Sequence, residues 1–333
     1  MHKPVVIVGC TASGKSDLAE ALAERLGGAL MAVDSMQVYR GMDIGTAKPD
    51  RATRERIPHL MIDVCDPWET YSAARFAADA STYFNHQDTK APRLILVAGT
   101  ILYLRALLEG MFEGPGANEE IRKRLGEEAG RVGARVLHER LKGVDSVAAG
   151  RIHPNDLRRI VRALEVFELT GSPISTLQTQ WAENHPRAEA VFIGIRRDKE
   201  ALNRRINARV RKMIEMGLVE EVDRLRKDPR GFSPEAASGV GYRQLLDHFA
   251  GKCSLDEAIE QIKIQTRHLA KLQRTWLKRF PPPQNVQWLE ASEEQSGAEL
   301  VEAAIAKLAE NGSSDLANVD SPPRHQGTKI FRK

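Results

Sequence analysis

The sequence predicts an α/β protein, with a parallel sheet covered by helices on both faces and an all-helical domain inserted into it. Short apolar runs rich in β-branched residues alternate with helical stretches, as in parallel sheets whose strands are joined by helical crossovers. A separate segment, residues 113–190, has helical patterning with Gly and Pro breaks and no convincing strand. The length of 333 residues is enough for about two domains.

Five apolar runs predict the strands, in the order Pro4–Val8, Ala29–Val33, Arg93–Ala98, Ala190–Ile195 and Val286–Leu289. A helix is expected between the first two, because leucines recur at helical spacing over Asp17–Leu26 and two glycines then end the pattern. Residues 200–279 are again helical in pattern.

These elements predict a core formed by residues 1–112 and 191–310, with 113–190 as the helical insertion. The last segment, 311–333, is rich in Ser, Asp, Asn, Pro and Gly. It has too little apolar surface to offset the entropy of ordering, so we expect it to be disordered.

The composition excludes several classes of protein. No apolar stretch reaches the ~18 residues of a membrane span, and the N-terminus lacks the apolar core of a secretory signal. The three cysteines are an odd number without C-x-x-C spacing, which favours reduced thiols over disulfides or a zinc site. We therefore expect a cytoplasmic protein with no membrane partner. A monomer is also expected, although the composition does not bear on it.

The residues with the clearest chemistry lie after the first strand. Gly9–Ser16 fits the phosphate-loop pattern G-x-x-x-x-G-K-[ST] and lies between a strand and a helix, so the predicted core is P-loop NTPase-like. Its glycines let backbone N–H groups surround an anion, Lys15 supplies a positive charge, and the Ser16 hydroxyl can bind Mg²⁺. The loop is predicted to bind a phosphate chain, but its sequence does not identify the molecule that carries the phosphates.

Asp34 follows the second predicted strand and is the acidic residue found at a strand end, on a strand expected to neighbour the phosphate loop. The third strand ends in Ala98-Gly99-Thr100 without the usual aspartate, and no N-K-x-D motif for reading guanine occurs. A carboxylate at this edge of the sheet can bind Mg²⁺ through water or accept a proton from a nucleophile. A simple helix N-cap is the structural alternative.

The positive charge is concentrated in one segment. The whole chain has a formal net charge of +4, but residues 191–280 alone carry 20 basic and 12 acidic groups. Five basic residues there share one helix face: Lys263, Arg267, Lys271, Arg274 and Lys278. No acid occurs between Gln261 and Trp288, which favours contacts with RNA phosphates over a merely solvated face. Another face, with Ile262, Leu269, Leu272 and Trp276, is expected to pack on the core.

Beyond the phosphate loop, the block Asp34–Pro49 resembles bacterial tRNA dimethylallyltransferases. Further matches follow in order at Pro58-His59, Tyr71–Phe76, Asn155-Asp156, Arg205–Val210, Gly239–Gln244 and Thr266–Leu277. The resemblance covers about residues 4–290. It implies transfer of a dimethylallyl group from its diphosphate to N6 of the adenosine 3′ of the tRNA anticodon, with Mg²⁺ as cofactor and the anticodon stem-loop as partner.

The resemblance also implies roles for individual residues. Asp34 would be the general base, and Thr100 and Arg209 would act on the diphosphate. The diphosphate would be held by Gly9, Thr11, Ala12, Ser13, Gly14, Lys15 and Ser16, with Ser16 binding the metal. The tRNA would be contacted by Asp34, Ser35, Met36, Gln37, Arg158, Arg159, Ile160, Val161, Arg162, Gly241, Tyr242 and Arg243, in addition to the five basic residues above.

Two other readings stay open from the residues alone. An adenylate prenyltransferase acting on free nucleotide would share the chemistry but have little use for the helical insertion or the basic face. A P-loop metabolite kinase would share the phosphate loop but would need ATP. The chain also departs from the family pattern at Cys10, commonly Pro, and at Ile101, commonly Gly.

Overall fold

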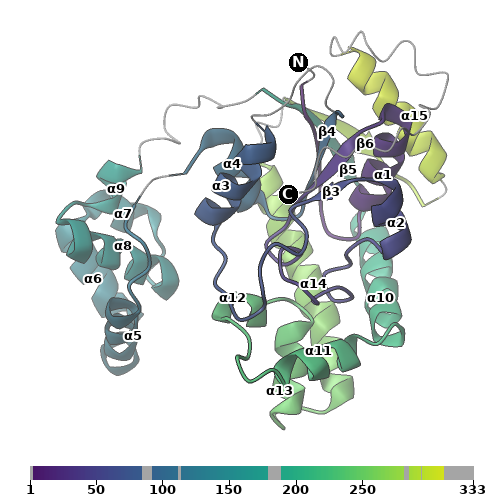
Figure 1. Ribbon diagram of the computed structural model, residues 1–333. Coiled ribbons are helices and arrows are strands. Elements are labelled where there is room, and N and C mark those ends of the chain that lie inside the picture. Colours follow the sequence, from purple (N-terminus) through teal and green to yellow (C-terminus); the bar gives the residue numbers. More distant parts are fainter. Residues whose placement is uncertain are drawn as a thin grey trace. The chain divides into compact units, whose positions relative to one another are not determined.

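The chain forms two compact units, Met1–Leu108 with Ala188–Lys333, and Glu109–Arg187. The computed structural model describes residues 3–84, 92–111, 114–178, 189–280, 285–293 and 295–310 (Figure 1). The segment 311–333, expected to be disordered, lies outside the described residues.

A six-stranded parallel sheet forms the centre of the first unit, in the order β3-β2-β4-β1-β5-β6. Its strands are β1 Val5–Gly9, β2 Ala29–Val33, β3 His59–Leu60, β4 Leu94–Ala98, β5 Val191–Arg196 and β6 Val286–Glu290. The sheet confirms the predicted parallel α/β core. The two-residue β3 was not predicted, since it is too short to leave an apolar run in the sequence.

Sheet register places the polar residues that follow the strands at one edge. β1 lies between β4 and β5, with Gly9 opposite Ile195. β2 pairs with β4 so that Val33 lies opposite Ala98. Because all these strands are parallel, the residues just beyond them, Asp34 and Gly99 among them, emerge at the same edge as the phosphate loop.

Helices cover both faces of this sheet. α1 (Lys15–Leu26) and α15 (Gly297–Glu310) bury Leu22 and Leu308 in one core with β1 and β4. Figure 1 shows α3 (Ala73–Phe84) and α4 (Ile101–Glu109) on the other side. The remaining helices of the unit are α2 Arg51–Arg56, α10 Lys199–Glu215, α11 Leu218–Arg226, α12 Pro234–Ala237, α13 Tyr242–Phe249 and α14 Leu255–Leu277.

The second unit is all helical where it is described. It comprises α5 Glu119–Val132, α6 Ala134–Val144, α7 Ser146–Arg151, α8 Leu157–Thr170 and α9 Ile174–Leu177. These helices enclose a core of their own around Leu125, Leu137, Leu141 and Ile160, each 0% exposed.

The packing of α14 corrects one expectation. Ile262 is buried, but Leu269, Leu272 and Trp276 are 37%, 48% and 38% exposed. The inward residues of the helix are Ala258, Ile262, Ala270, Gln273 and Leu277. A polar Gln therefore takes a place in the buried stripe, and the apolar residues beside it face solvent.

Among the described residues, no helix is long and apolar enough to cross a membrane.

Candidate active site

The phosphate loop connects β1 to α1 and needs its two glycines. A Cβ at Gly9 would lie 2.8 Å from Ser13 Oγ and 3.0 Å from the Ile195 carbonyl. Gly14, directly before α1, has φ 102° in the left-handed region. α1 begins without a side-chain cap, so the N–H groups of its first turn remain available to an anion.

Two arginines hold the loop from outside. Arg197 Nε donates to the Ser13 carbonyl and Arg205 Nε to the Ala12 carbonyl, both at 2.8 Å. Ser13 Oγ is buried and has no hydrogen-bond partner among the described residues. A loop with engaged carbonyls, free helix-start amides and an unpaired buried hydroxyl fits a phosphate group well.

Three charged groups interact at this loop. Lys15 is 8% exposed and its Nζ donates to the Cys10 carbonyl at 2.8 Å. Burial lowers the pKa of Lys15 to about 8; the Arg209 charge also lowers it, while Asp34 opposes the shift. Burial likewise lowers the pKa of Arg209, and the Asp34 charge again opposes it. The structure therefore brings the predicted Lys15, Arg209 and Asp34 within electrostatic reach of one another.

Asp34 is partly buried directly after β2. Its Oδ1 accepts the backbone N–H groups of Met36 at 2.8 Å and Gln37 at 3.3 Å, which fixes the start of the following turn. The helix N-cap alternative is wrong, because a turn follows Asp34 and the next helix, α2, begins only at Arg51. What the carboxylate makes instead is a turn cap. It uses one carboxylate oxygen and leaves Oδ2 without a hydrogen-bond partner among the described residues, so capping and base chemistry are compatible.

The Gly99-Thr100 turn lies against this carboxylate. The N–H groups of Gly99 and Thr100 both donate to the Val33 carbonyl, at 3.0 and 2.9 Å. Thr100 Oγ1 accepts the Ser35 N–H at 3.0 Å and donates to Ser35 Oγ at 3.1 Å. Ile101 begins α4 and is 6% exposed, so the departure at this position is absorbed as a core residue of the helix.

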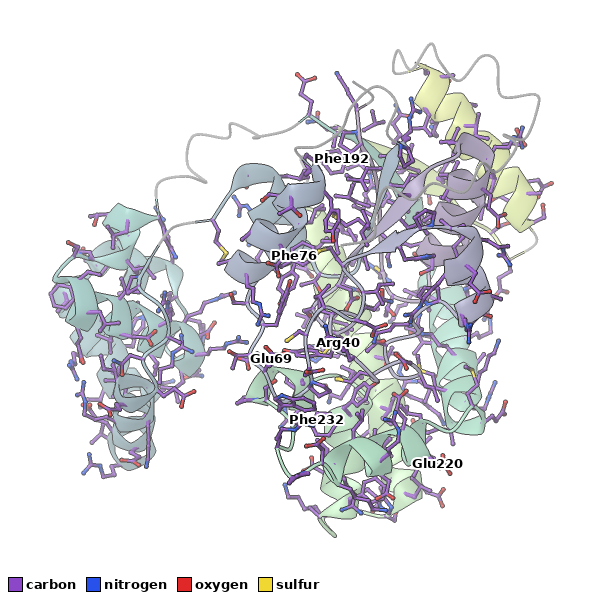
Figure 2. The ribbon with its side chains drawn as sticks, viewed as in Figure 1. Arg40, Glu69, Phe76, Phe192, Glu220 and Phe232 are labelled. Carbon is purple, nitrogen blue, oxygen red and sulfur yellow. The ribbon has the colours of Figure 1, made fainter. Side chains whose placement is uncertain are left out.

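The loop after Asp34 is anchored to α11 by Glu221. This carboxylate accepts the N–H groups of Asp43, Ile44 and Gly45 at 2.9, 2.8 and 3.3 Å, and also the Tyr242 hydroxyl at 2.6 Å. It is 6% exposed, whereas its neighbour Glu220 points outward from α11 (Figure 2). Burial strongly raises the pKa of Tyr242.

Three of the residues expected to contact tRNA have buried side chains. Tyr242 and Ile160 are 0% exposed and Val161 is 8% exposed. Tyr242 holds Glu221, while the other two belong to the core of the helical unit. Their side chains therefore support the surfaces beside them. Arg243 is exposed, and Gly241 is buried at the start of α13.

The arginines predicted to contact tRNA from the helical unit differ in exposure and in how many partners they already have within that unit. Arg158 and Arg159 are exposed on α8, and Arg159 pairs with Asp156 at 3.2 Å. Arg162 is half-buried and donates to Glu165 at 2.6 Å and to the Pro115 carbonyl at 2.7 Å. Arg162 therefore stabilises its own unit through these two contacts.

The basic face of α14 also divides in two. Lys263 and Arg267 both pair with Glu260, at 3.0 and 3.6 Å, and Arg267 donates to Asn207. Glu260 directly precedes the acid-free stretch that begins at Gln261, so the sequence pattern does not include it. Lys271, Arg274 and Lys278 are exposed, with no ion-pair partner among the described residues. These three form the free part of the basic face.

Gln273 is a site residue that sequence reasoning missed. It is 8% exposed, its Oε1 accepts the Thr11 N–H at 2.7 Å, and its Nε2 donates to the Gly99 carbonyl at 2.8 Å. Thr11, one of the predicted phosphate ligands, therefore has its amide already engaged. The only feature in the sequence that could have indicated Gln273 is a glutamine on the inward face of an amphipathic helix.

The site suits a Mg²⁺ ion that binds mainly through the phosphates of a substrate. The described residues contain no cluster of three or more His, Cys, Asp or Glu side chains. Ser16 is exposed at the first turn of α1, beside the amides that suit an anion. Mg²⁺ commonly takes one or two protein ligands together with substrate phosphates and waters, which this donor set satisfies.

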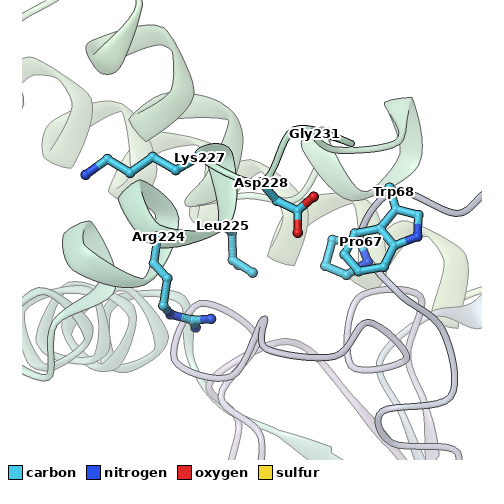
Figure 3. A pocket seen from close by; sticks show the side chains of 7 residues that line it. All are labelled: Pro67, Trp68, Arg224, Leu225, Lys227, Asp228 and Gly231. Carbon is cyan, nitrogen blue, oxygen red and sulfur yellow. The ribbon is translucent and has the colours of Figure 1, made fainter.

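A separate pocket of about 270 Å³ lies between residues 67–68 and the C-terminal end of α11 (Figure 3). It is lined by Pro67, Trp68, Arg224, Leu225, Lys227, Asp228 and Gly231. None of these is a candidate catalytic or phosphate-binding residue.

Comparison with protein families matches residues 37–280 to the IPP transferase family. The chain belongs to the IPP transferase family. It is 48% identical over 279 residues to the tRNA dimethylallyltransferase of Geobacter metallireducens, which covers 83% of this chain and 89% of that protein. It is 44% identical over 293 residues to tRNA dimethylallyltransferase 2 of Geotalea uraniireducens, covering 87% of this chain and 93% of that one.

Solved structures agree with this assignment and with the predicted fold. The full-length tRNA isopentenylpyrophosphate transferase of Bacillus halodurans is 35% identical, covers 95% of this chain and 99% of its own, and superposes with a TM-score of 0.65. A eukaryotic dimethylallyltransferase crystallised while acting on tRNA is 28% identical, covers 94% of this chain and 80% of its own, and has a TM-score of 0.77.

Proposed function

We propose that this protein transfers a dimethylallyl group from dimethylallyl diphosphate to N6 of the adenosine immediately 3′ of the anticodon in tRNA. The observation that carries the proposal is the convergence of Lys15, Arg209 and Asp34, within electrostatic reach of one another, at the edge of the sheet in a chain of the IPP transferase family. Positive charge suits a diphosphate leaving group, and a carboxylate with one free oxygen suits a proton acceptor.

The reaction breaks the C–O bond between the allylic carbon and the diphosphate and forms a bond from that carbon to N6. Adenine N6 is a poor nucleophile because its lone pair is delocalised into the ring. Asp34 Oδ2 takes the N6 proton as the new bond forms, and diphosphate leaves with the electron pair of the C–O bond.

The phosphate loop stabilises the charge that develops on the leaving group. Amides at the start of α1, Lys15, Ser13 Oγ and Arg209 are the donors, and a fixed donor costs no reorganisation as charge appears. Ser16 would hold Mg²⁺ at this loop, and the ion would supply further neutralisation of the charge on the leaving group.

The tRNA would lie along the exposed cations. Lys271 and Arg274 on α14, with Lys278 at its C-terminal end, suit the phosphate backbone. Arg158 and Arg159 offer a second contact on the helical unit. The target base must leave its stack to reach Asp34, as in other enzymes that modify bases. We propose a cytoplasmic monomer that needs the anticodon stem-loop for substrate recognition.

Single-turnover labelling tests the proposal. Protein, labelled dimethylallyl diphosphate and Mg²⁺ are mixed with unmodified tRNA or with AMP, and the products are identified as nucleosides. Label in N6-dimethylallyladenosine from tRNA is the expected result. Label in AMP alone would indicate an adenylate prenyltransferase, and ATP-dependent phosphoryl transfer without prenyl transfer would indicate a kinase.

A further inference from the structure

We propose that Gln273 is a positioning residue that sets the spacing between the phosphate loop and the Gly99-Thr100 turn, whose Thr100 is expected to act on the diphosphate. Its side-chain amide joins the Thr11 N–H of the phosphate loop to the Gly99 carbonyl of the Gly99-Thr100 turn. The inference rests on the proposed function, because it concerns how that site is held together.

The chemistry of the two partners fixes the orientation of the amide. A backbone N–H can only donate and a carbonyl can only accept, so Oε1 must face Thr11 and Nε2 must face Gly99. The distances of 2.7 and 2.8 Å are those of good hydrogen bonds. Only a side chain with one acceptor and one donor on the same planar group satisfies both loops at once.

The surroundings of Gln273 make this bridge rigid. Ala270, one turn earlier on α14, packs with Cys10, Leu202 and Ile206, and its carbonyl accepts the Cys10 thiol at 3.4 Å. Gln273 itself is 8% exposed, so water does not readily replace either bond. The helix thus approaches the phosphate loop closely at the level of the bridge.

The Gly99 end of the Gln273 bridge is connected by hydrogen bonds to the residues around Asp34. The N–H groups of Gly99 and Thr100 donate hydrogen bonds to the Val33 carbonyl, and the Thr100 hydroxyl is hydrogen-bonded to Ser35, the residue after Asp34. A change in the Gln273 bridge therefore alters the distance between the phosphate loop and the turn that carries Thr100. Gln273 need not touch the substrate to have this effect.

Three variants test the inference. Gln273→Met keeps the size of the side chain but loses both hydrogen bonds, and Gln273→Glu changes them. Gln261→Met, on the exposed side of α14, is the control. Calorimetric titration with Mg²⁺ and diphosphate measures the dissociation constant of the leaving group. For Gln273→Met we expect that constant to rise about tenfold, as for loss of buried hydrogen bonds, with tRNA affinity unchanged. Wild-type diphosphate affinity in Gln273→Met would overturn the inference.

Gln273→Glu keeps the proposal testable if the Met variant does not fold. An ionised Glu accepts from Thr11 but repels the Gly99 carbonyl, whereas a protonated Glu has the same donor and acceptor pattern as Gln. Diphosphate affinity of this variant, divided by that of the wild type, is expected to rise as pH falls. A ratio independent of pH would contradict the positioning role. If the wild type binds diphosphate but transfers no prenyl group, the proposed reaction fails while these titrations still decide the role of Gln273.

Discussion

Asp34 and Gly99 are in such close contact that no side chain fits between them. A Cβ added at Gly99 would lie 2.1 Å from Asp34 Oδ2 and 3.1 Å from its Cγ. Glycine is therefore required here by the space that the carboxylate occupies. The same contact fixes where Oδ2 lies, because the other oxygen is already bonded to the turn at Met36 and Gln37.

Gly99→Ala is expected to displace the Asp34 carboxylate while leaving the fold intact. A misplacement of about 1 Å in a reacting group lowers a rate by about 10²-fold, and we expect a loss of that order in the single-turnover rate. Gly126→Ala is the matched control, since nothing lies within 4 Å of a Cβ at that helical position. A wild-type rate in Gly99→Ala would show that the carboxylate position does not limit the reaction.

Asp34→Asn separates the two functions of this side chain. The amide oxygen of Asn can still accept the Met36 N–H, so the turn is retained, but the base is lost. We expect the single-turnover rate to fall by about 10²–10⁴-fold, the usual contribution of a general base. Binding of diphosphate, measured by calorimetry, should persist. Full activity in Asp34→Asn would exclude Asp34 as the proton acceptor.

The sheet and the loop between β1 and α1 could be predicted because their signals are local. A β-branched run, a G-x-x-x-x-G-K-S segment and a following helical period each lie within a few residues. Gln273 could not be found this way, because its two partners lie 262 and 174 residues away along the chain. Its position follows from packing between α14 and the phosphate loop, which no local pattern encodes.

The direction that a side chain faces was the least predictable feature. Tyr242 lies in a motif that resembles a tRNA-binding segment, yet it is 0% exposed and bonded to Glu221. Leu272 and Trp276 have the spacing of a core stripe, but the inward stripe of α14 passes through Gln273 and Leu277 instead. Amphipathic spacing defines faces of a helix, and tertiary packing decides which face is buried.

Tyr242→Phe should weaken the fold and leave RNA affinity unchanged. The variant removes a hydrogen bond to the buried Glu221 carboxylate, so we expect the free energy of unfolding to fall by about 1.5–3 kcal/mol. Urea unfolding and tRNA binding by filter retention measure the two effects. Loss of tRNA affinity at unchanged stability would instead mean that Tyr242 contacts RNA directly.

Removing the free cations of α14 should lower the salt dependence of tRNA binding. Each phosphate contact contributes about 0.7–0.9 to the slope of log affinity against log salt, so Lys271→Ala, Arg274→Ala and Lys278→Ala together should reduce the slope by about 2–3. Lys263→Ala with Arg267→Ala is the comparison, and a smaller change is expected because Glu260 already pairs with both. Equal slopes for both sets would place the RNA elsewhere.

Diphosphate affinity should depend on pH through Lys15. Burial lowers the pKa of this ammonium to about 8, and a bound diphosphate adds negative charge that raises it again. The complex therefore holds more protons than the free protein above about pH 8, so affinity must fall as pH rises through that range. Lys15→Arg is the control, because its guanidinium stays charged throughout. The ratio of the two dissociation constants removes the titration of diphosphate itself, and a ratio that does not change between pH 7 and 9.5 would show that Lys15 remains fully protonated in the free protein.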